Sequence, residues 1–276
     1  MTRVLVTNDD GVSAPGILAL ASALAADHDV VVAAPGDEAS GMSAALTAVV
    51  SDGQIVIEPY AMPRITAYGV AASPAYIVVL ASLGVFGPPP DIVVSGINRG
   101  ANAGRAVLHS ATVGAALTAA NYGMRAMAVS LDVLTTESSG SAASGGNAIV
   151  VPSDDVLHWR TAASVASDLM EAVVSAPAGT VLNVNVPDTE PMPEVREASL
   201  ASFGQASIAV AEAGEGFVRT TIERSGEKLA PGSDLALLAE GFATVTALRP
   251  PAAVGGLRIP EQRAAPSGSE RRSGLV

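Results

Sequence analysis

The sequence predicts an α/β protein with a mainly parallel sheet and a C-terminal antiparallel β extension. The chain opens with a strand, a helix and a second strand within about 35 residues, which is the pattern of a βαβ unit. Apolar strand patterns and helical patterns then alternate as far as residue 187. From residue 195 the pattern changes to short strands with alternating side chains, which favours an antiparallel extension over a second independent domain.

The first unit is predicted to comprise a strand at 3–7, a helix at 13–27 and a strand at 29–35. Ser13 is a suitable N-cap for this helix, and Pro15 is tolerated in its first turn. Ile17 and Leu20 begin an apolar face with helical spacing. Because the crossover joins parallel strands, it is expected to be right-handed.

The rest of the core follows from apolar runs, helical periodicity and turn signals. Strands are predicted at 53–60, 65–70, 90–96, 126–131 and 180–187. Helices are predicted at 73–84 with a Ser73 cap, at 111–123 and at 154–176. Residues 133–149 are rich in serine and glycine, which predicts a mobile loop.

The C-terminal part is predicted to hold strands at 207–213, 217–223 and 242–248. We divide the chain into an α/β core at 1–194, a β extension with a closing strand at 195–248 and a tail at 249–276. The tail is rich in proline, glycine and arginine and is expected to be disordered. An exposed ribbon has unpaired edges, so the extension is expected to serve oligomerisation.

Composition favours a cytoplasmic protein with a sizeable core. The chain has 276 residues, 49% of them hydrophobic, and a mean hydropathy of +0.40. No stretch approaches the roughly 18 uninterrupted apolar residues of a membrane span, and the N-terminus lacks a signal-sequence pattern. The absence of cysteine excludes disulfides and thiolate metal sites.

The charge of the chain bears on its partners. The net charge is −12 and the pI about 4.6, which disfavours binding to DNA or RNA through their phosphates. Aromatic residues make up 3%, fewer than proteins that stack long single strands usually carry. A small anionic substrate remains compatible with this composition if a metal or backbone N–H groups meet its charge locally.

Three predicted core strands end in polar residues. The first strand runs into Asp9 and Asp10, the second is followed by a turn containing Ser40, and the 90–96 strand is followed by Asn98. Ligands bind at the carboxyl ends of parallel strands, so these four side chains are expected to converge. Carboxylate, hydroxyl and amide oxygens suit Mg²⁺, Mn²⁺ or Ca²⁺, and such a cation offsets the cost of paired carboxylates.

The segment after this metal site suits a phosphate. The glycine-rich turn at 96–104 is expected to expose N–H groups, and the next helix begins near two hydroxyl residues. A metal beside a phosphate cradle indicates a phosphatase. The candidates for phosphate or substrate binding are Asn8, Gly41, Gly100, Asn102, Ser110 and Thr112.

At these residues the sequence resembles the SurE family, the stationary-phase survival proteins. The matching segments are "VLVTNDDGVSAPGI" (4–17), "SGMS" (40–43), "PDIVVSGINRGAN" (90–102), "SATVGAA" (110–116), "LNVNVP" (182–187) and "SDLALLAEGFATVTAL" (233–248). The first and third motifs together, at this spacing, are specific. The resemblance covers residues 1 to 248, and its implied fold is a Rossmann-like three-layer α/β/α core with a C-terminal extension that swaps between subunits.

The resemblance implies a metal-dependent 5′/3′-nucleotidase that dephosphorylates nucleoside monophosphates with broad base specificity. It implies one divalent metal per subunit, Mg²⁺ or Mn²⁺ with Ca²⁺ as a substitute in crystals, on Asp9, Asp10, Ser40 and Asn98. Asp9 and Asp10 would also be the catalytic residues, and the assembly would be a homodimer or homotetramer. The chain departs from the family where Glu38 and its neighbours replace basic residues, which leaves the substrate range open.

Two other functions stay open. One is a non-catalytic nucleotide- or phosphate-binding protein, and the other is a general acid phosphatase or polyphosphatase. A phosphorelay receiver is excluded, because it needs a later lysine and the evident lysine, Lys228, lies far downstream.

Several side chains near the site have no assigned role. His109 could donate a proton, and Arg99 and Arg105 could meet a phosphate or simply face solvent. The aromatic residues nearest by sequence for stacking a base are Tyr60, Tyr68 and Tyr76. With so few of them, we expect rates on the four common monophosphates to agree within about tenfold.

Overall fold

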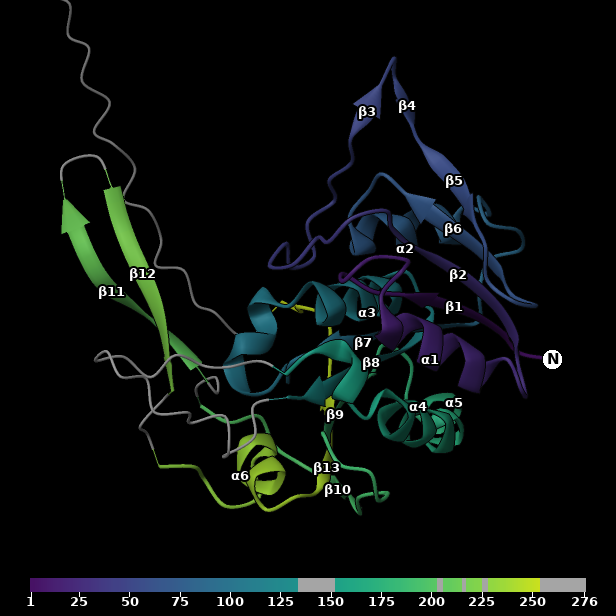
Figure 1. The fold of residues 1–276 in the computed structure, drawn as a ribbon. Coiled ribbons are helices and arrows are strands. Elements are labelled where there is room, and N and C mark those ends of the chain that lie inside the picture. The colour runs from purple at the N-terminus through teal and green to yellow at the C-terminus, as the bar shows by residue number, and fades with distance from the viewer. Residues whose placement is uncertain (134–151, 203–205, 215–216, 225–227, 254–276) are drawn as a thin grey trace, which may run out of the picture.

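The computed structural model describes residues 1–133, 152–202, 206–214, 217–224 and 228–253. A nine-stranded sheet forms the middle of three layers, with helices on both of its faces (Figure 1). This confirms the predicted α/β fold with a mainly parallel sheet. In order across the sheet, the strands are β10 (Val195–Glu197), β13 (Ala243–Leu248), β9 (Val181–Pro187), β8 (Arg125–Asp132), β7 (Ile92–Arg99), β1 (Arg3–Thr7), β2 (Asp29–Pro35), β6 (Thr66–Val70) and β5 (Ile57–Tyr60).

The centre of the sheet is parallel and its margins are mixed. Strand β1 pairs in parallel with both β2 and β7, and β8, β9 and β6 continue in the same direction. Strands β5 and β13 run antiparallel to their neighbours β6 and β9. The carboxyl ends of β1, β2 and β7 therefore lie together at one edge, as the first βαβ unit predicts.

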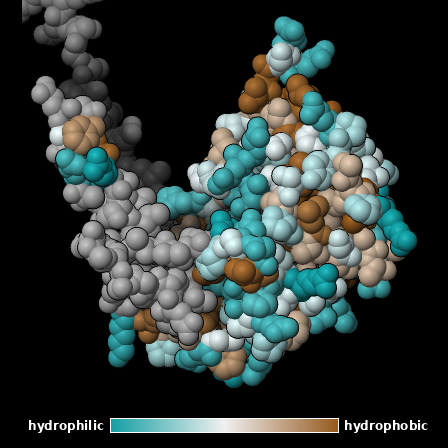
Figure 2. Space-filling view, viewed as in Figure 1, coloured by the Kyte–Doolittle hydropathy of each residue, from teal (hydrophilic) through white to brown (hydrophobic). Residues whose placement is uncertain are grey.

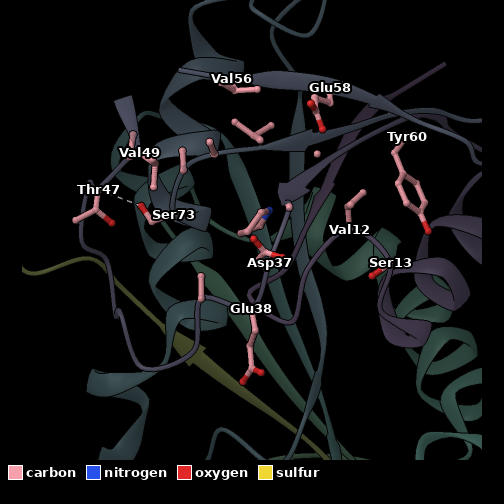
Figure 3. A pocket seen from close by; sticks show the side chains of 18 of the residues that line it. Val12, Ser13, Asp37, Glu38, Thr47, Val49, Val56, Glu58, Tyr60 and Ser73 are labelled. Carbon is pink, nitrogen blue, oxygen red and sulfur yellow. Dashed lines mark hydrogen bonds between the residues drawn. The ribbon is translucent and has the colours of Figure 1, made fainter. Parts of the chain in front are cut away.

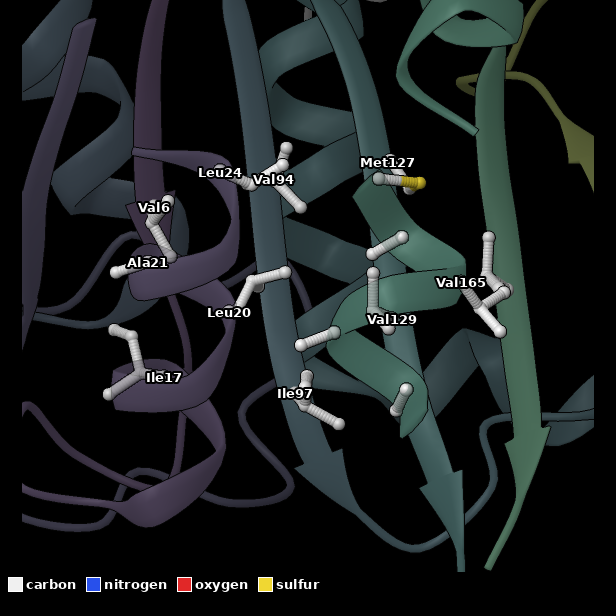
Figure 4. Packing of buried hydrophobic residues seen from close by; sticks show 14 of the residues in the cluster. Val6, Ile17, Leu20, Ala21, Leu24, Val94, Ile97, Met127, Val129 and Val165 are labelled. Carbon is white, nitrogen blue, oxygen red and sulfur yellow. The ribbon is translucent and has the colours of Figure 1, made fainter. Parts of the chain in front are cut away.

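The two helical layers are α1 (Pro15–Leu24), α4 (Trp159–Asp168) and α5 (Met170–Ser175) on one face, and α2 (Pro74–Ser82) and α3 (Ala111–Asn121) on the other. Figure 4 shows Ile17, Leu20 and Leu24 of α1 pointing onto the sheet, where all three are fully buried. Gly16 permits this close packing, because a Cβ at that position would lie 2.3 Å from the carbonyl oxygen of Ile97. Helix α1 thus meets the end of β7 beside the loops that follow β1, β2 and β7.

Several predicted helix boundaries are wrong. Helix α1 starts at Pro15 with Ala14 as its N-cap, so Ser13 lies outside the helix and its side chain is exposed. The helix predicted at 154–176 is divided into a short 3₁₀ turn, α4 and α5, with Leu169 between the two α-helices. Ser73 does cap α2 by position, but its hydroxyl donates to the carbonyl of Ala45 instead.

The strand predicted at 53–60 is divided between a projecting hairpin and the edge of the main sheet. It is split into β4 (Gln54–Ile55) and β5, and β4 pairs with β3 (Val50–Ser51) in a separate two-stranded sheet. Figure 2 shows hydrophobic side chains on this projection. Val49 and Val50 there are 74% and 56% exposed.

The C-terminal part is divided between two structures. Strands β11 (Ala206–Gly214) and β12 (Phe217–Arg224) form the predicted antiparallel ribbon, which stands away from the body of the molecule (Figure 1). Strands β10 and β13 instead join the main sheet, and α6 (Asp234–Ala239) packs against β13. The division expected after residue 194 therefore does not coincide with a change of sheet.

The loop predicted at 133–149 falls almost wholly outside the described residues, as does the tail from 254 onward. Within the described part of the chain, no helix combines the length and apolar character needed to cross a membrane.

Candidate active site

The loops after β1, β2 and β7 enclose a cavity of about 710 Å³ at the edge of the sheet. Asp9, Asp10, Ser40 and Asn98 all line it, as their positions at the strand ends predict. Three further candidates, Gly41, Asn102 and Ser110, also line the cavity. The cavity therefore collects most of the chemistry-bearing residues that the sequence singles out.

Asp9 is fixed in place by the helix across the sheet. Its side chain is 4% exposed, and its Oδ1 accepts a hydrogen bond of 2.6 Å from the hydroxyl of Thr112. Its carbonyl oxygen accepts a 2.7 Å bond from the N–H of Ala39, which ties the first loop to the serine loop. Burial raises the pKa of Asp9 above its usual value, so the carboxylate is costly here without a compensating cation.

The carboxyl of Asp10 also has a raised pKa. Burial, followed by the negative charges of Asp9 and Glu38, raises the pKa of Asp10 to about 7. Its Oδ2 is buried and has no hydrogen-bond partner. A buried carboxylate oxygen with no donor is the position that a bound cation would satisfy.

Asn98 and Ser40 supply neutral oxygens. The amide nitrogen of Asn98 donates to the carbonyl of Gly100 at 2.8 Å, which leaves its amide oxygen available to a metal. The Ser40 hydroxyl donates to Oε1 of Glu38 at 2.8 Å, and its oxygen keeps lone pairs for a second partner. Both side chains are therefore oriented so that an oxygen remains for a hard cation.

The charges around the cavity also fit a divalent metal. Asp9, Asp10, Glu38 and Asp154 line it, and Arg99 supplies the only arginine or lysine among the described lining residues. The described chain offers no group of three His, Cys, Asp or Glu side chains placed to hold a metal. A metal here would therefore need the amide and hydroxyl oxygens as well as the two carboxylates, which suits Mg²⁺ or Mn²⁺ and not Zn²⁺.

The opposite wall of the cavity is the start of α3. Ser110 is the N-cap, and its hydroxyl accepts a 3.1 Å hydrogen bond from the N–H of Val113. Ser110 and Ala111 both line the cavity, so the positive end of the helix dipole faces it. This end of the helix suits an anionic oxygen beside the metal.

The loop that carries Asn102 is held by a second motif. The Asn102 N–H donates to Asn185 Oδ1 at 2.7 Å, and its carbonyl accepts bonds from the side-chain amides of Asn183 (2.8 Å) and Asn185 (3.1 Å). Its own side-chain amide donates to the Ser130 hydroxyl at 2.8 Å. The "NVN" segment of β9 thus holds the backbone N–H and carbonyl of Asn102 in place.

Two other contacts tie the site loops to distant segments. Asp234, at the start of α6, is fully buried and accepts a 2.7 Å bond from the N–H of Gly104. The Ser43 hydroxyl donates to the carbonyl of Leu108 at 2.7 Å. Gly114 permits this approach, because a Cβ there would lie 2.5 Å from the carbonyl group of Ser43.

Comparison with known proteins decides the family. The model of the family described as "Survival protein SurE" matches residues 4–210. This chain belongs to the SurE family.

Individual relatives agree with this assignment along most of the chain. The "5′/3′-nucleotidase SurE" of Erwinia tasmaniensis is 34% identical over 254 residues, which is 89% of each protein. The "5′-nucleotidase SurE" of Stenotrophomonas maltophilia is 40% identical over 207 residues, or 73% of this chain and 70% of that one. The crystal structure of the SurE protein from Aquifex aeolicus has a TM-score of 0.67 at 25% identity, covering 90% of this chain and 93% of that one.

Three predicted residues lie outside the wall of this SurE cavity. Asn8 is buried, and its amide nitrogen donates to the carbonyl of Gly11 at 2.9 Å. The Gly100 N–H donates to the carbonyl of Leu131 at 2.9 Å, so it shapes the loop. Thr112 is buried behind Asp9 and reaches the cavity only through that carboxylate.

Two of the three charged residues without an assigned role line the cavity, and the third does not. Arg99 lines the cavity and forms an ion pair of 3.2 Å with Asp154. His109 also lines the cavity with an exposed side chain. Arg105 is exposed and is not among the residues that line it.

Sequence reasoning missed Glu38, Asp154, Asn183, Asn185 and Asp234 as parts of this site. The last three lie in segments that carry the family resemblance, "LNVNVP" and "SDLALL", so the signal was present without a role attached. No pattern in the sequence around Asp154 indicates its place at the cavity, where it forms an ion pair with the distant residue Arg99.

Proposed function

We propose that this SurE family member hydrolyses nucleoside monophosphates at the cavity beside β1, with one divalent metal per subunit. The chain is a nucleotidase by its family, and relatives that match it along most of their length are named 5′/3′-nucleotidase or 5′-nucleotidase. The observation that carries the site is the adjacent pair Asp9 and Asp10, which line the cavity together with the start of α3. Asp9 is buried, and Oδ2 of Asp10 has no hydrogen-bond partner. Nucleotidases of this family depend on a divalent metal, and the donor set favours Mg²⁺ or Mn²⁺.

Asp9, Asp10, Ser40 and Asn98 would hold the metal. When bound, the cation would neutralise the paired carboxylates, polarise a phosphoryl oxygen and lower the pKa of a coordinated water. Thr112 fixes the carboxylate plane of Asp9 through its 2.6 Å hydrogen bond. The Asp9 carboxylate is therefore already oriented before a metal binds.

The remaining residues bind and orient the phosphate. The N-terminus of α3, with Ser110, faces the phosphoryl oxygens, and the Asn102 side chain stands on the adjacent wall. Asp9 then acts either as the base that takes a proton from the attacking water or as the nucleophile itself. His109 lines the cavity where a proton donor to the leaving ester oxygen is needed.

The ribbon β11–β12 is proposed to join subunits into a homodimer or homotetramer. Phe217 and Val218 at its tip are 50% and 62% exposed, and its edges are unpaired within the described chain. Burying such edges and apolar residues against a second subunit removes an aggregation hazard. In this view residues 1–194, with β10 and β13, form the catalytic body.

The decisive experiment is hydrolysis of AMP by metal-free and metal-restored enzyme. Protein treated with EDTA should be inactive, and Mg²⁺ or Mn²⁺ should restore the rate, because the buried carboxylates need the cation. Asp9→Asn should lose most of the restored rate. Full activity in metal-free protein would overturn the proposal. Nucleotide binding without turnover would support a binding protein, and faster cleavage of polyphosphate than of any nucleotide would support a polyphosphatase.

A further inference from the structure

A second cavity adjoins the metal site. It also measures about 710 Å³, and it shares Ser13 and Glu38 with the first cavity. Its walls come from the loop after β1, the end of β2 and the strands β5 and β6 (Figure 3). We call it the base cavity. Because the two cavities share Ser13 and Glu38, a substrate whose phosphate lies at Asp10 could extend past these residues into the second cavity.

The walls of the base cavity are largely apolar. Val12 and Val70 are buried in its floor, and Tyr60, Val56 and Met42 lie around it. In Figure 3, Val56 lies on one side of the hollow and Val12 on the other, with the ring of Tyr60 at one end. Two apolar walls facing each other suit a flat ring.

The charged side chains of the base cavity are all carboxylates. Asp37, Glu38 and Glu58 line it, and the described lining residues include no lysine, arginine or histidine. Such walls repel a phosphate and attract N–H groups. A second anionic group, as in a polyphosphate or a bisphosphate, is therefore disfavoured on this side of the metal site.

We propose that the base cavity holds the nucleobase of a nucleoside monophosphate whose phosphate is bound at the metal site. This inference rests on the proposed function and adds the position and chemistry of base recognition. Each common nucleobase has apolar faces and at least one N–H group, so carboxylate acceptors bind all four with little discrimination. The base cavity therefore predicts a preference for nucleotides over other phosphomonoesters, with little discrimination among the bases.

Only one of the tyrosines expected near the base is available. Tyr60 lines the base cavity, whereas the ring of Tyr68 packs against Phe86 with centroids 5.4 Å apart. Tyr76 packs against the core cluster under α2. Base recognition therefore depends on aliphatic walls and carboxylates, which a count of aromatic residues could not reveal.

Gly36 provides a test that leaves the metal site intact. It lines the base cavity alone, and a Cβ at this position meets no atom within 4 Å. Gly36→Leu can therefore be accommodated at its Cβ, and we expect its side chain to occupy part of the base cavity. We would compare kcat/KM for AMP and for ribose 5-phosphate, which has the same sugar and ester without a base.

The wild-type enzyme should favour AMP over ribose 5-phosphate by about tenfold or more, because the base buries apolar surface. Gly36→Leu should lower kcat/KM for AMP by about tenfold while ribose 5-phosphate stays within about twofold. The ribose 5-phosphate rate also reports that the variant is folded with an intact metal site. Equal changes in kcat/KM for both substrates, or no change for either, would overturn the proposal that the base cavity holds the nucleobase. If the metal-loaded wild type cleaves neither substrate, the proposed function itself is wrong.

A second variant tests the acidic walls. Glu58 lines the base cavity only, and we would compare GMP with xanthosine monophosphate, whose base is an anion at mildly alkaline pH. The wild type should have a lower kcat/KM for xanthosine monophosphate than for GMP. Glu58→Gln should reduce this gap, the ratio of the two kcat/KM values, severalfold, because it removes one negative charge. Glu171→Gln, at an exposed glutamate of α5 outside both cavities, is the matched control and should leave the gap unchanged. An unchanged gap in Glu58→Gln would show that this carboxylate does not face the base.

Discussion

The Thr112 hydroxyl donates to Asp9 Oδ1 at 2.6 Å, joining residues 103 positions apart in the chain. Thr112 lies in the first turn of α3 and Asp9 just after β1, so the bond couples the phosphate side of the site to its metal side. Both side chains are buried, and the bond opposes the rise that burial causes in the pKa of Asp9. Thr112 is thus a positioning residue, not a group that touches substrate.

Replacing Thr112 by valine should lower both metal affinity and kcat/KM by about tenfold to a hundredfold, as loss of a partner to a ligand typically does. Valine keeps the shape and removes the hydroxyl. Thr112→Ser, which restores the donor, should recover most of both values. The measurements are Mn²⁺ titration and AMP kinetics. Equal losses in the serine and valine variants would show that packing, rather than the hydrogen bond, is what Thr112 provides.

Asp10→Asn should abolish activity and yet stabilise the metal-free protein at neutral and alkaline pH. The folded-state pKa of Asp10 is raised from 3.8 to about 7, mainly by burial, so the folded state holds this proton more tightly than the unfolded state. Its contribution to stability is therefore present below about pH 4 and is lost as the pH rises towards about 7. Thermal melts of both proteins in EDTA should differ by several degrees near pH 8 and converge near pH 4. A variant that melts lower at pH 8 would contradict the assignment of a buried, uncompensated charge.

Metal binding should compete with protonation of the same carboxylate. Because a ligand must be deprotonated to bind a cation, the apparent affinity for Mn²⁺ should fall below pH 7, by up to about tenfold per pH unit. Calorimetric titrations at several pH values would also detect protons released on metal binding below about pH 7, where Asp10 carries a proton before the metal binds. An affinity that stays constant between about pH 5 and pH 8 would place the metal away from Asp10.

Parts of this site could be predicted from the sequence because their chemistry is local. Asp9, Asp10 and Asn98 follow directly from the rule that ligands bind where parallel strands end. The Ser13 cap failed because the helix begins at Pro15, which leaves Ala14 in the capping position. Local patterns thus located strand ends better than helix starts.

Other parts depend on contacts between distant segments. Asn183 lies 81 positions from Asn102, and Asp234 lies 130 positions from Gly104. No local pattern distinguishes a buried asparagine that holds a loop from one that faces solvent. The base cavity likewise arises where an antiparallel strand, β5, is added beside β6, and the sequence gives no order of strands from which to derive it.

The "NVN" segment of β9 leads to a separate prediction. The Asn185 side chain accepts a hydrogen bond from the Asn102 N–H and donates one to its carbonyl. Asn185→Ala removes both bonds and should leave the loop that carries Asn102 more mobile. The expected result is a fall of about a hundredfold in kcat/KM for AMP with Mn²⁺ affinity unchanged, because Asp9, Asp10 and Ser40 lie on other loops and Asn98 is held within strand β7. Asn185→Asp, which keeps the acceptor for the Asn102 N–H, should lose less. A parallel loss of metal affinity would mean that Asn185 supports the whole site rather than the phosphate side.

The ribbon β11–β12 is expected to hold the subunits together, and two shortened chains test this by light scattering. Ending the chain after Arg249 keeps β13 and should leave both the oligomer and the activity intact, because the lost residues lie beyond the last strand. Replacing residues 203–227 by a short linker removes the ribbon and spares β10, the Ala201 N–H bond to Asp234 and α6. Without the ribbon the protein should become monomeric or aggregate, since the surface that pairs with it on a second subunit is left uncovered. Each subunit carries its own Asp9, Asp10, Ser40 and Asn98, so a monomer that stays folded should retain metal binding. An unchanged oligomer after loss of the ribbon would show that another surface, such as the exposed hairpin β3–β4, joins the subunits.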